Sequence, residues 1–291
     1  MGAQIVLTQA VWWLDLNQTS VHIAKVESVR LPAVAGSFYP AQKEALRQAI
    51  NTYISEANPV SRTAKALVVP HAGYIYSGPI AGQAYRALTQ LSPAPKRVVL
   101  LGPCHHLPVQ SLALPESSSF ATPLCQTPID QQAYEKLAKL PFVDINKEAH
   151  AHEHSLEVQL PFLQSTLASF SLLPLVVGRA SSEEICQVLE LVIDNSTLIV
   201  VSTDLSHYLP YDLACQIDRE TVKAILQGNR ELVVGNRACG AYPLKGLMSF
   251  AQKKGWTAEL LDLRNSGDTA GDKDRVVGYG AFIYHEQGFN E

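Results

Sequence analysis

Short apolar runs recur along the chain and predict buried β-strands. Five of them are nearly continuous in β-branched residues or leucine, and they occupy residues 66–69, 97–101, 172–177, 198–202 and 276–284. Uninterrupted apolar character, in place of alternation with polar residues, is typical of strands that are covered on both faces. The pattern therefore predicts a sheet that lies inside the protein.

Segments with helical spacing lie between these runs. Apolar residues recur every three or four positions at Leu46, Ile50, Tyr53 and Ile54, at Ile80, Ala84, Tyr85 and Leu88, and at Leu156, Leu160, Leu163 and Leu167. Ser77 is expected to cap the second of these helices, with Pro79 in its first turn. Because strands and helices alternate, the chain is expected to form an α/β fold with layers of helices around a central sheet.

The domain organisation follows from length and texture. The chain has 291 residues, of which 47% are hydrophobic, and no long linker or charge run divides it. An α/β unit of this size is commonly a single domain. Residues 1–28 differ from the rest through Trp12, Trp13 and a polar stretch at 17–20. We therefore expect an N-terminal extension of unknown role at 1–28 and one domain at 29–291.

Charge and cysteine content exclude several classes of protein. The net charge of −4 arises from acidic and basic residues that are scattered along the chain, so a nucleic-acid partner is not expected. Five cysteines without a CxxC pair indicate a reducing compartment, and we expect a cytoplasmic protein. Asp15 interrupts the apolar stretch at 6–16, which argues against a signal peptide or a membrane span.

Histidines follow three of the predicted strands directly. Residues 66–69 lead to His71, residues 97–101 lead to His105 and His106, and residues 198–202 lead to Asp204 and His207. Ligands of open α/β sheets bind beyond the carboxyl ends of the strands, so this placement predicts a site. Metal ligation is favoured for His71 and His105. Proton transfer is favoured for His207, with Asp204 orienting it or sharing its proton.

Cys239 is a candidate ligand of another kind. It follows Arg237 and precedes an apolar helical segment at 244–250, and both features favour the thiolate form that binds metals. An ordinary buried thiol explains the position equally well. Cys104 is a weaker candidate of the same type.

Two polar segments have less specific patterns. The tract His150-Ala151-His152-Glu153-His154 could bind a metal by itself, but a solvated loop that enters a helix is favoured, with His154 beside the site or facing a substrate. Residues 265–274 have the composition of a calcium loop without the EF-hand order of ligands, and they are interpreted as a polar loop that borders the crevice. No GxSxG, P-loop, GxGxxG or HExxH motif occurs.

Taken together, these segments resemble the Memo family. The match runs in the family's order from about Val29 to the C-terminus and rests on AGSFYP at 35–40, PHAGY at 70–74, LGPCHH at 101–106, EHSLE at 153–157, STDLSH at 202–207, CG at 239–240 and GDKDRVVGY at 271–279. The resemblance implies a fold related to the class III extradiol dioxygenases, a single-domain α/β/α sandwich around a mostly mixed sheet. It also implies a metal bound by His71, His105 and Cys239, with His207 and Asp204 as catalytic residues. The matching motifs add His154, Glu157, His106 and Tyr74 as residues that surround the ligands or the substrate.

One departure limits what the resemblance implies about activity. Ring-cleaving dioxygenases complete their iron site with a carboxylate, whereas this chain offers Cys239, so ring cleavage does not transfer with the fold. The leading hypothesis is a mononuclear metal protein with oxygen-dependent or redox chemistry that uses Fe(II) first and copper second. The alternatives are a phosphotyrosine-type peptide-binding module, a component of a modification pathway with radical-SAM and AMMECR-type partner proteins, and a zinc hydrolase.

Overall fold

The computed structural model describes residues 28–287, and its centre is a nine-stranded mixed sheet with the order β10-β12-β2-β9-β3-β8-β4-β7 and with β11 paired to β12. The strands of this sheet are β2 (Ala66–Val69), β3 (Arg97–Pro103), β4 (Leu112–Leu114), β7 (Val143–Ile145), β8 (Ser171–Val177), β9 (Thr197–Ser202), β10 (His207–Leu209), β11 (Trp256–Asn265) and β12 (Val276–Glu286). A second sheet has the order β1-β5-β6 and consists of β1 (Val29–Arg30), β5 (Ser119–Ala121) and β6 (Gln126–Pro128). The expected mixed sheet is thus present.

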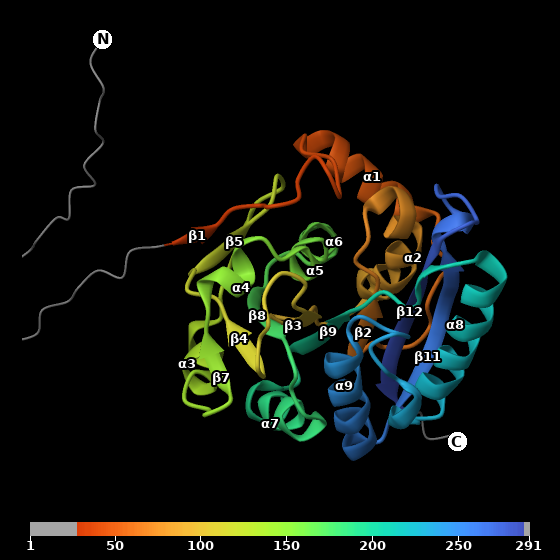
Figure 1. The fold of residues 1–291 in the computed structure, drawn as a ribbon. Coiled ribbons are helices and arrows are strands. Elements are labelled where there is room, and N and C mark those ends of the chain that lie inside the picture. Colours follow the sequence, from red (N-terminus) through yellow and green to blue (C-terminus); the bar gives the residue numbers. More distant parts are fainter. Residues whose placement is uncertain (1–27, 288–291) are drawn as a thin grey trace, which may run out of the picture.

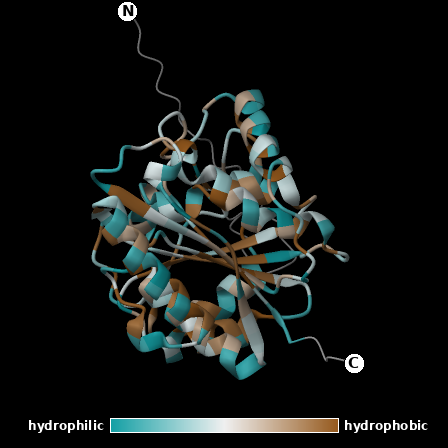
Figure 2. Cartoon of the chain, turned by 90° about the vertical axis from the view of Figure 1, so that its right-hand side faces the viewer, coloured by the Kyte–Doolittle hydropathy of each residue, from teal (hydrophilic) through white to brown (hydrophobic). Residues whose placement is uncertain are grey.

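All five strands expected from continuous apolar runs are present as β2, β3, β8, β9 and β12. Strands β2, β9, β3 and β8 run parallel to one another, and Val69 of β2 pairs with Ser202 of β9. Their apolar side chains are buried, and Figure 2 shows hydrophobic strands in the middle of the molecule. Burial on both faces explains why these sequences do not alternate.

Helices cover both faces of the sheet (Figure 1). Their bounds are α1 (Lys43–Ser55), α2 (Tyr74–Arg86), α3 (Gln131–Leu137), α4 (Lys147–Ala151), α5 (His154–Glu157), α6 (Leu160–Thr166), α7 (Ser182–Val192), α8 (Tyr211–Leu226) and α9 (Ala241–Lys254), with short 3-10 turns at Ala87–Gln90, Arg230–Leu232 and Ser266–Asp268. Helices α1, α2 and α6 share one core with Leu67 and Val69 of β2. Helices α3, α7, α8 and α9 share the other core with Ala66 and Val68 of the same strand. The α/β/α sandwich is therefore confirmed as one domain.

Two expectations about helices need correction. Helix α2 begins at Tyr74, so Pro79 lies inside the helix, and the Ser77 hydroxyl donates to the carbonyl of Ala72 at 2.8 Å and does not cap the helix. The helix expected around 156–167 is divided into α5 and α6. Pro161 lies in the first turn of α6, where its missing N–H costs nothing, and this favours a new helix start.

The N-terminal predictions concern residues that are almost entirely outside the described range. Residues 1–27, including Trp12, Trp13 and the apolar stretch at 6–16, are not among residues 28–287. The described part opens with β1, which pairs in parallel with β5. Within residues 28–287, no helix combines the length and the apolar character needed to cross a bilayer.

Candidate metal centre

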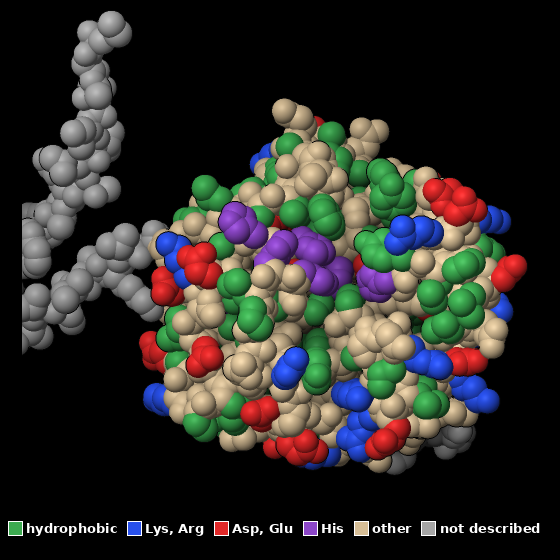
Figure 3. Space-filling model, in the orientation of Figure 1, with side chains coloured by type: hydrophobic (Ala, Val, Ile, Leu, Met, Phe, Trp, Pro, Cys, Tyr) green, Lys and Arg blue, Asp and Glu red, His purple; other side chains and the backbone are tan. Residues whose placement is uncertain are grey.

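The carboxyl ends of three neighbouring parallel strands bring the predicted residues to one edge of the sheet. His71 follows β2, Asp204 follows β9 and His105 follows β3, in the order in which these strands lie side by side. His207 is the first residue of β10. In Figure 3, histidine side chains gather in a hollow on the face of the molecule that is turned to the viewer. The expected convergence of imidazoles at this edge is therefore observed.

Three histidines form the centre of the site. His71, His105 and His154 each offer one ring nitrogen, and these nitrogens all lie within 4.8 Å of one another. The ring centroids of His105 and His154 are 4.6 Å apart and nearly parallel, while His71 lies edge-on to both at 5.2 and 5.4 Å. Burial holds the pKa of His71 well below its ordinary value, so its imidazole is neutral, which is the form that binds metals.

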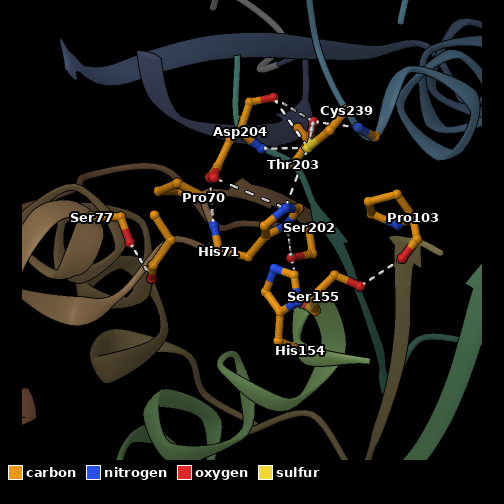
Figure 4. A network of polar contacts seen from close by, with 12 residues as sticks. Pro70, His71, Ser77, Pro103, His154, Ser155, Ser202, Thr203, Asp204 and Cys239 are labelled. Carbon is orange, nitrogen blue, oxygen red and sulfur yellow. Dashed lines mark hydrogen bonds and ion pairs between the residues drawn. The ribbon is translucent and has the colours of Figure 1, made fainter. Parts of the chain in front are cut away.

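Hydrogen bonds determine which nitrogen of His71 carries the lone pair. The Ser202 hydroxyl donates to the carbonyl of Ser155 at 2.6 Å, so its oxygen is left to accept from His71 Nδ1 at 3.0 Å. The proton therefore lies on Nδ1, and Nε2 carries the free lone pair. Figure 4 shows this chain of contacts from His71 through Ser202. Fixing the tautomer in this way is how proteins prepare a histidine ligand.

Glu153 performs the same task for His105. Its buried carboxylate accepts the backbone N–H of His105 at 2.6 Å and the ring Nδ1–H at 2.9 Å, and it also accepts the N–H of Ser155 at 2.8 Å. Burial alone would raise the pKa of Glu153, but the hydrogen bonds and charge of His105 lower it to about 2. His105 Nε2 is thus left as the coordinating nitrogen. Both histidines fit a cation, because each presents an unprotonated Nε2.

Cys239 lies next to His71, outside the three-histidine group. Its Sγ is 3.3 Å from His71 Nε2 and accepts the backbone N–H of Asp204 at 3.2 Å (Figure 4). This close approach to the end of β9 requires glycine at position 240, where a Cβ would lie 2.7 Å from the carbonyl oxygen of Ser202. Burial and the nearby Asp204 raise the pKa of the thiol to about 12, so without a cation it holds its proton.

Asp204 and His207 supply proton-transfer groups beside the histidines. Asp204 accepts the backbone N–H of His71 at 2.7 Å, and burial raises its pKa to about 7. His207 donates from Nδ1 to the carbonyl of Leu205 at 2.8 Å, so its Nε2 is unprotonated, and burial lowers its pKa. At neutral pH the pair therefore offers one base and one carboxyl that exists in both protonation states.

These groups open into a cleft of about 700 Å³. Aromatic side chains form much of its wall, and they are Phe38, Tyr76, Tyr208 and Tyr279. Ser266, Gly271 and Asp272 also line it, so the polar loop at 265–274 borders the crevice as expected. The sequence does not mark these aromatic residues as part of a site, because phenylalanine and tyrosine also occur in protein cores.

Several predicted residues lie elsewhere. Glu157 is fully buried and does not line the cleft; it accepts the Tyr39 hydroxyl at 2.6 Å and pairs with Arg30. The Tyr74 hydroxyl donates to the carbonyl of Val158, and Tyr74 is absent from the cleft lining. His106 is exposed, with its ring centroid 6.3 Å from that of His154. Glu153, which was not predicted, takes the orienting role.

Comparison with known proteins shows which family the chain belongs to. The sequence pattern of the Memo-like protein family matches residues 30–283. The chain belongs to the Memo family. It is 36% identical to a MEMO1 family protein of Aquifex aeolicus over 268 residues, which covers 88% of this chain and 99% of that one. It is 38% identical to a MEMO1 family protein of Ignicoccus hospitalis over 279 residues, which covers 87% of this chain and 97% of that one.

A solved structure also aligns with the Memo chain. It is an uncharacterised protein of Escherichia coli K12, which is 17% identical, has a TM-score of 0.46, and aligns over 74% of this chain and 98% of its own. The histidines, the thiol and the acids of the cleft all lie within the region that the Memo pattern matches. Residues 1–28, for which an N-terminal extension is expected, lie before that region.

Proposed function

We propose that this Memo protein binds a single metal ion, Fe(II) first and copper second, and performs oxygen-dependent or redox chemistry in the cleft. The observation that carries the proposal is the direction of the lone pairs. His71 Nδ1–H donates to Ser202, and His105 Nδ1–H donates to Glu153. Two unprotonated Nε2 atoms are therefore available in the cluster at the carboxyl ends of the strands. Two such nitrogens and one soft ligand suit iron or copper.

Cys239 is the third ligand in this proposal, and His154 faces the substrate. The sulfur already contacts His71 Nε2, and the N–H of Asp204 points to it as it would to a thiolate. A cation would supply the positive charge that this buried thiol needs in order to lose its proton. Burial lowers the pKa of His154 to about 4, so its ring is neutral and available as a hydrogen-bonding partner.

Residues of the chain have separate tasks in the reaction. When bound, the metal would supply Lewis acidity and a redox couple. His207 Nε2 accepts a proton from a substrate hydroxyl, and Asp204, with a pKa of about 7, returns or takes up a proton near neutral pH. Phe38, Tyr76 and Tyr279 line the cleft with apolar surface that excludes water from the reacting groups.

Elemental analysis of purified variants tests the ligand set. Wild type is expected to hold about one metal per chain, because the cleft has one convergent donor set. His71→Ala and Cys239→Ser are expected to lose most of it, whereas His154→Ala retains it. His106→Ala is a matched control, because this exposed histidine neither lines the cleft nor belongs to the three-histidine group of residues 28–287. Equal metal content in all five proteins would refute the site.

A zinc hydrolase is the second candidate, and the three-histidine group is the observation that favours it. Three imidazoles with an open fourth position are a typical catalytic zinc site. In that case His154→Ala loses the metal and Cys239→Ser keeps it. Oxygen consumption by the metal-loaded protein, abolished by His207→Ala, would instead support the redox proposal.

A further inference from the structure

Tyr208 has an unusual backbone conformation at the mouth of the cleft. Its φ is 57°, in the left-handed region that non-glycine residues rarely adopt. The pairing of β10 with β12 shifts register here, since His207 pairs with Val277 and Leu209 with Val276, so that Tyr208 is the extra residue of a β-bulge. Bulges beside functional sites redirect a side chain. This one presents the Tyr208 ring to the cleft with 62% of the residue exposed.

Arg275 lies against this ring. Its guanidinium carbon is 5.2 Å from the Tyr208 ring centroid, which is a cation–π distance. Among the described residues that line the cleft, Arg275 is the only lysine or arginine. No ion pair joins it to any acid within residues 28–287. A positioned and unpaired guanidinium therefore faces the same cleft as the histidines.

The acidic residues that line the cleft do not pair with the Arg275 guanidinium. Asp272 also lines the cleft, but its Oδ1 accepts the backbone N–H groups of Asp274 at 3.0 Å and Arg275 at 3.4 Å, which makes it part of the loop. Asp204 also lines the cleft, where it accepts the backbone N–H of His71 and forms no ion pair with Arg275. The Arg275 side chain thus keeps donors for an incoming anion.

We infer that Tyr208 and Arg275 form an anion-recognition edge, and that the substrate is a planar organic anion whose charged group binds Arg275 while its flat body lies along the aromatic wall. This inference rests on the proposed function, because it places the other end of that molecule at the metal centre. Phe38, Tyr76 and Tyr279 supply the apolar surface that a flat body needs. A guanidinium fork binds the paired oxygens of carboxylate and phosphate alike, so the shared chemistry is an anionic oxygen group on a flat organic body.

Ligand binding to the full chain as purified tests the inference. Benzoate, phenyl phosphate and the neutral analogue benzamide are titrated at one ionic strength and followed by ligand-observed NMR. The variant is Arg275→Met. Lys273→Met is the matched control, because Lys273 lies in the same loop and stacks on Tyr211 at 4.4 Å but does not line the cleft. Both variants remove one positive charge from exposed positions, and elemental analysis records the metal content of each protein.

The expected result is selective. Arg275→Met weakens the binding of at least one anion by about fivefold or more, while benzamide binding and metal content stay as in wild type. Lys273→Met changes the affinity for the anions by less than about twofold, because Lys273 does not line the cleft and its solvent-exposed charge is screened. The anion that loses more affinity is the type that the edge recognises. Equal losses in the two variants, or no saturable binding of either anion to wild type, overturns the inference. If elemental analysis finds no metal in the wild-type protein, that result refutes the proposed function instead.

Discussion

The segment at residues 150–157 has two faces that use the same residue types for opposite purposes. Towards the core, His150 donates from Nε2 to the carbonyl of Ala113 at 2.9 Å, and Glu157 pairs with Arg30. Towards the cleft, Glu153 orients His105, and His154 joins the cluster of imidazoles. A histidine and a glutamate are therefore structural on one face and belong to the candidate site on the other.

The two faces differ in whether their side chains have nitrogen or oxygen atoms that a metal could reach. His150 is 2% exposed and Glu157 is fully buried, and the acceptors of Glu157 are occupied by Arg30, by the Tyr39 hydroxyl and by the N–H groups of Ala33 and Val34. His154 keeps a nitrogen within reach of two other imidazoles. Stability is therefore expected to depend on the core-facing residues, and metal binding on the cleft-facing ones.

The largest effect is expected from Glu157→Ala. The substitution leaves the Arg30 guanidinium buried without its carboxylate partner, and breaking a buried ion pair in this way costs about 3–5 kcal/mol of unfolding free energy. Denaturant titration measures the loss. Glu44→Ala removes half of an exposed pair with Arg47 and is the control, with an expected change below about 0.5 kcal/mol. A similar small change in Glu157→Ala would show that the core-facing carboxylate is dispensable.

His150 is expected to make stability depend on pH. Burial lowers its pKa to about 4 from an ordinary 6.5, so the folded protein resists protonation of His150 and the unfolded chain does not. Stability is therefore complete above pH 6.5 and declines as the pH falls towards 4, by up to about 3 kcal/mol for this group.

Comparison with His150→Asn isolates that contribution. Urea titrations of metal-free protein at several pH values are expected to show a stability gap between wild type and variant that is widest above pH 6.5 and narrows towards pH 4. Other histidines titrate in both proteins and cancel in the difference. A gap that stays constant with pH would mean that His150 does not resist protonation in the folded state.

On the cleft-facing side, Glu153→Gln is expected to weaken metal binding by about 10–100-fold. An amide keeps the size of the side chain, but it cannot accept all the N–H groups that the carboxylate accepts, so the His105 ring loses its fixed orientation. Competition with a chromophoric chelator measures the affinity. Glu148→Gln, at an exposed position of α4, should leave the affinity unchanged. An unaltered affinity in Glu153→Gln would place the orienting role elsewhere.

Much of the sheet could be predicted from sequence because burial on both faces leaves a simple signal. Strands β2, β3, β8 and β9 are continuous apolar runs with few polar interruptions. Strand β11 was not predicted, although it has ten residues, because nearly all its positions are half-buried and its register shifts between Leu260 and Asp262. Such a strand has neither a continuous nor an alternating pattern.

Strand order by itself predicts the site only where a side chain follows a strand directly. His71 and His105 satisfy that condition, so strand order alone brings them together. Glu153 and Glu157 do not, because the face that a one-turn helix turns to the cleft depends on how that helix is fixed. Here the Ser155 hydroxyl donates to the carbonyl of Pro103 at 2.8 Å and fixes α5 against the end of β3. No local pattern encodes that contact.

The smallest effect is expected from His152→Ala, and it tests whether the histidine tract binds metal by itself. His152 is exposed and lies between the two faces, in the turn that follows α4. Because the three-histidine group includes His154 but neither His150 nor His152, the substitution should change the unfolding free energy by less than about 0.5 kcal/mol and leave the metal content at the wild-type value. Elemental analysis beside a urea titration measures both. Loss of metal from His152→Ala would mean that the tract binds as a unit, and the division of residues 150–157 into two faces would then be wrong.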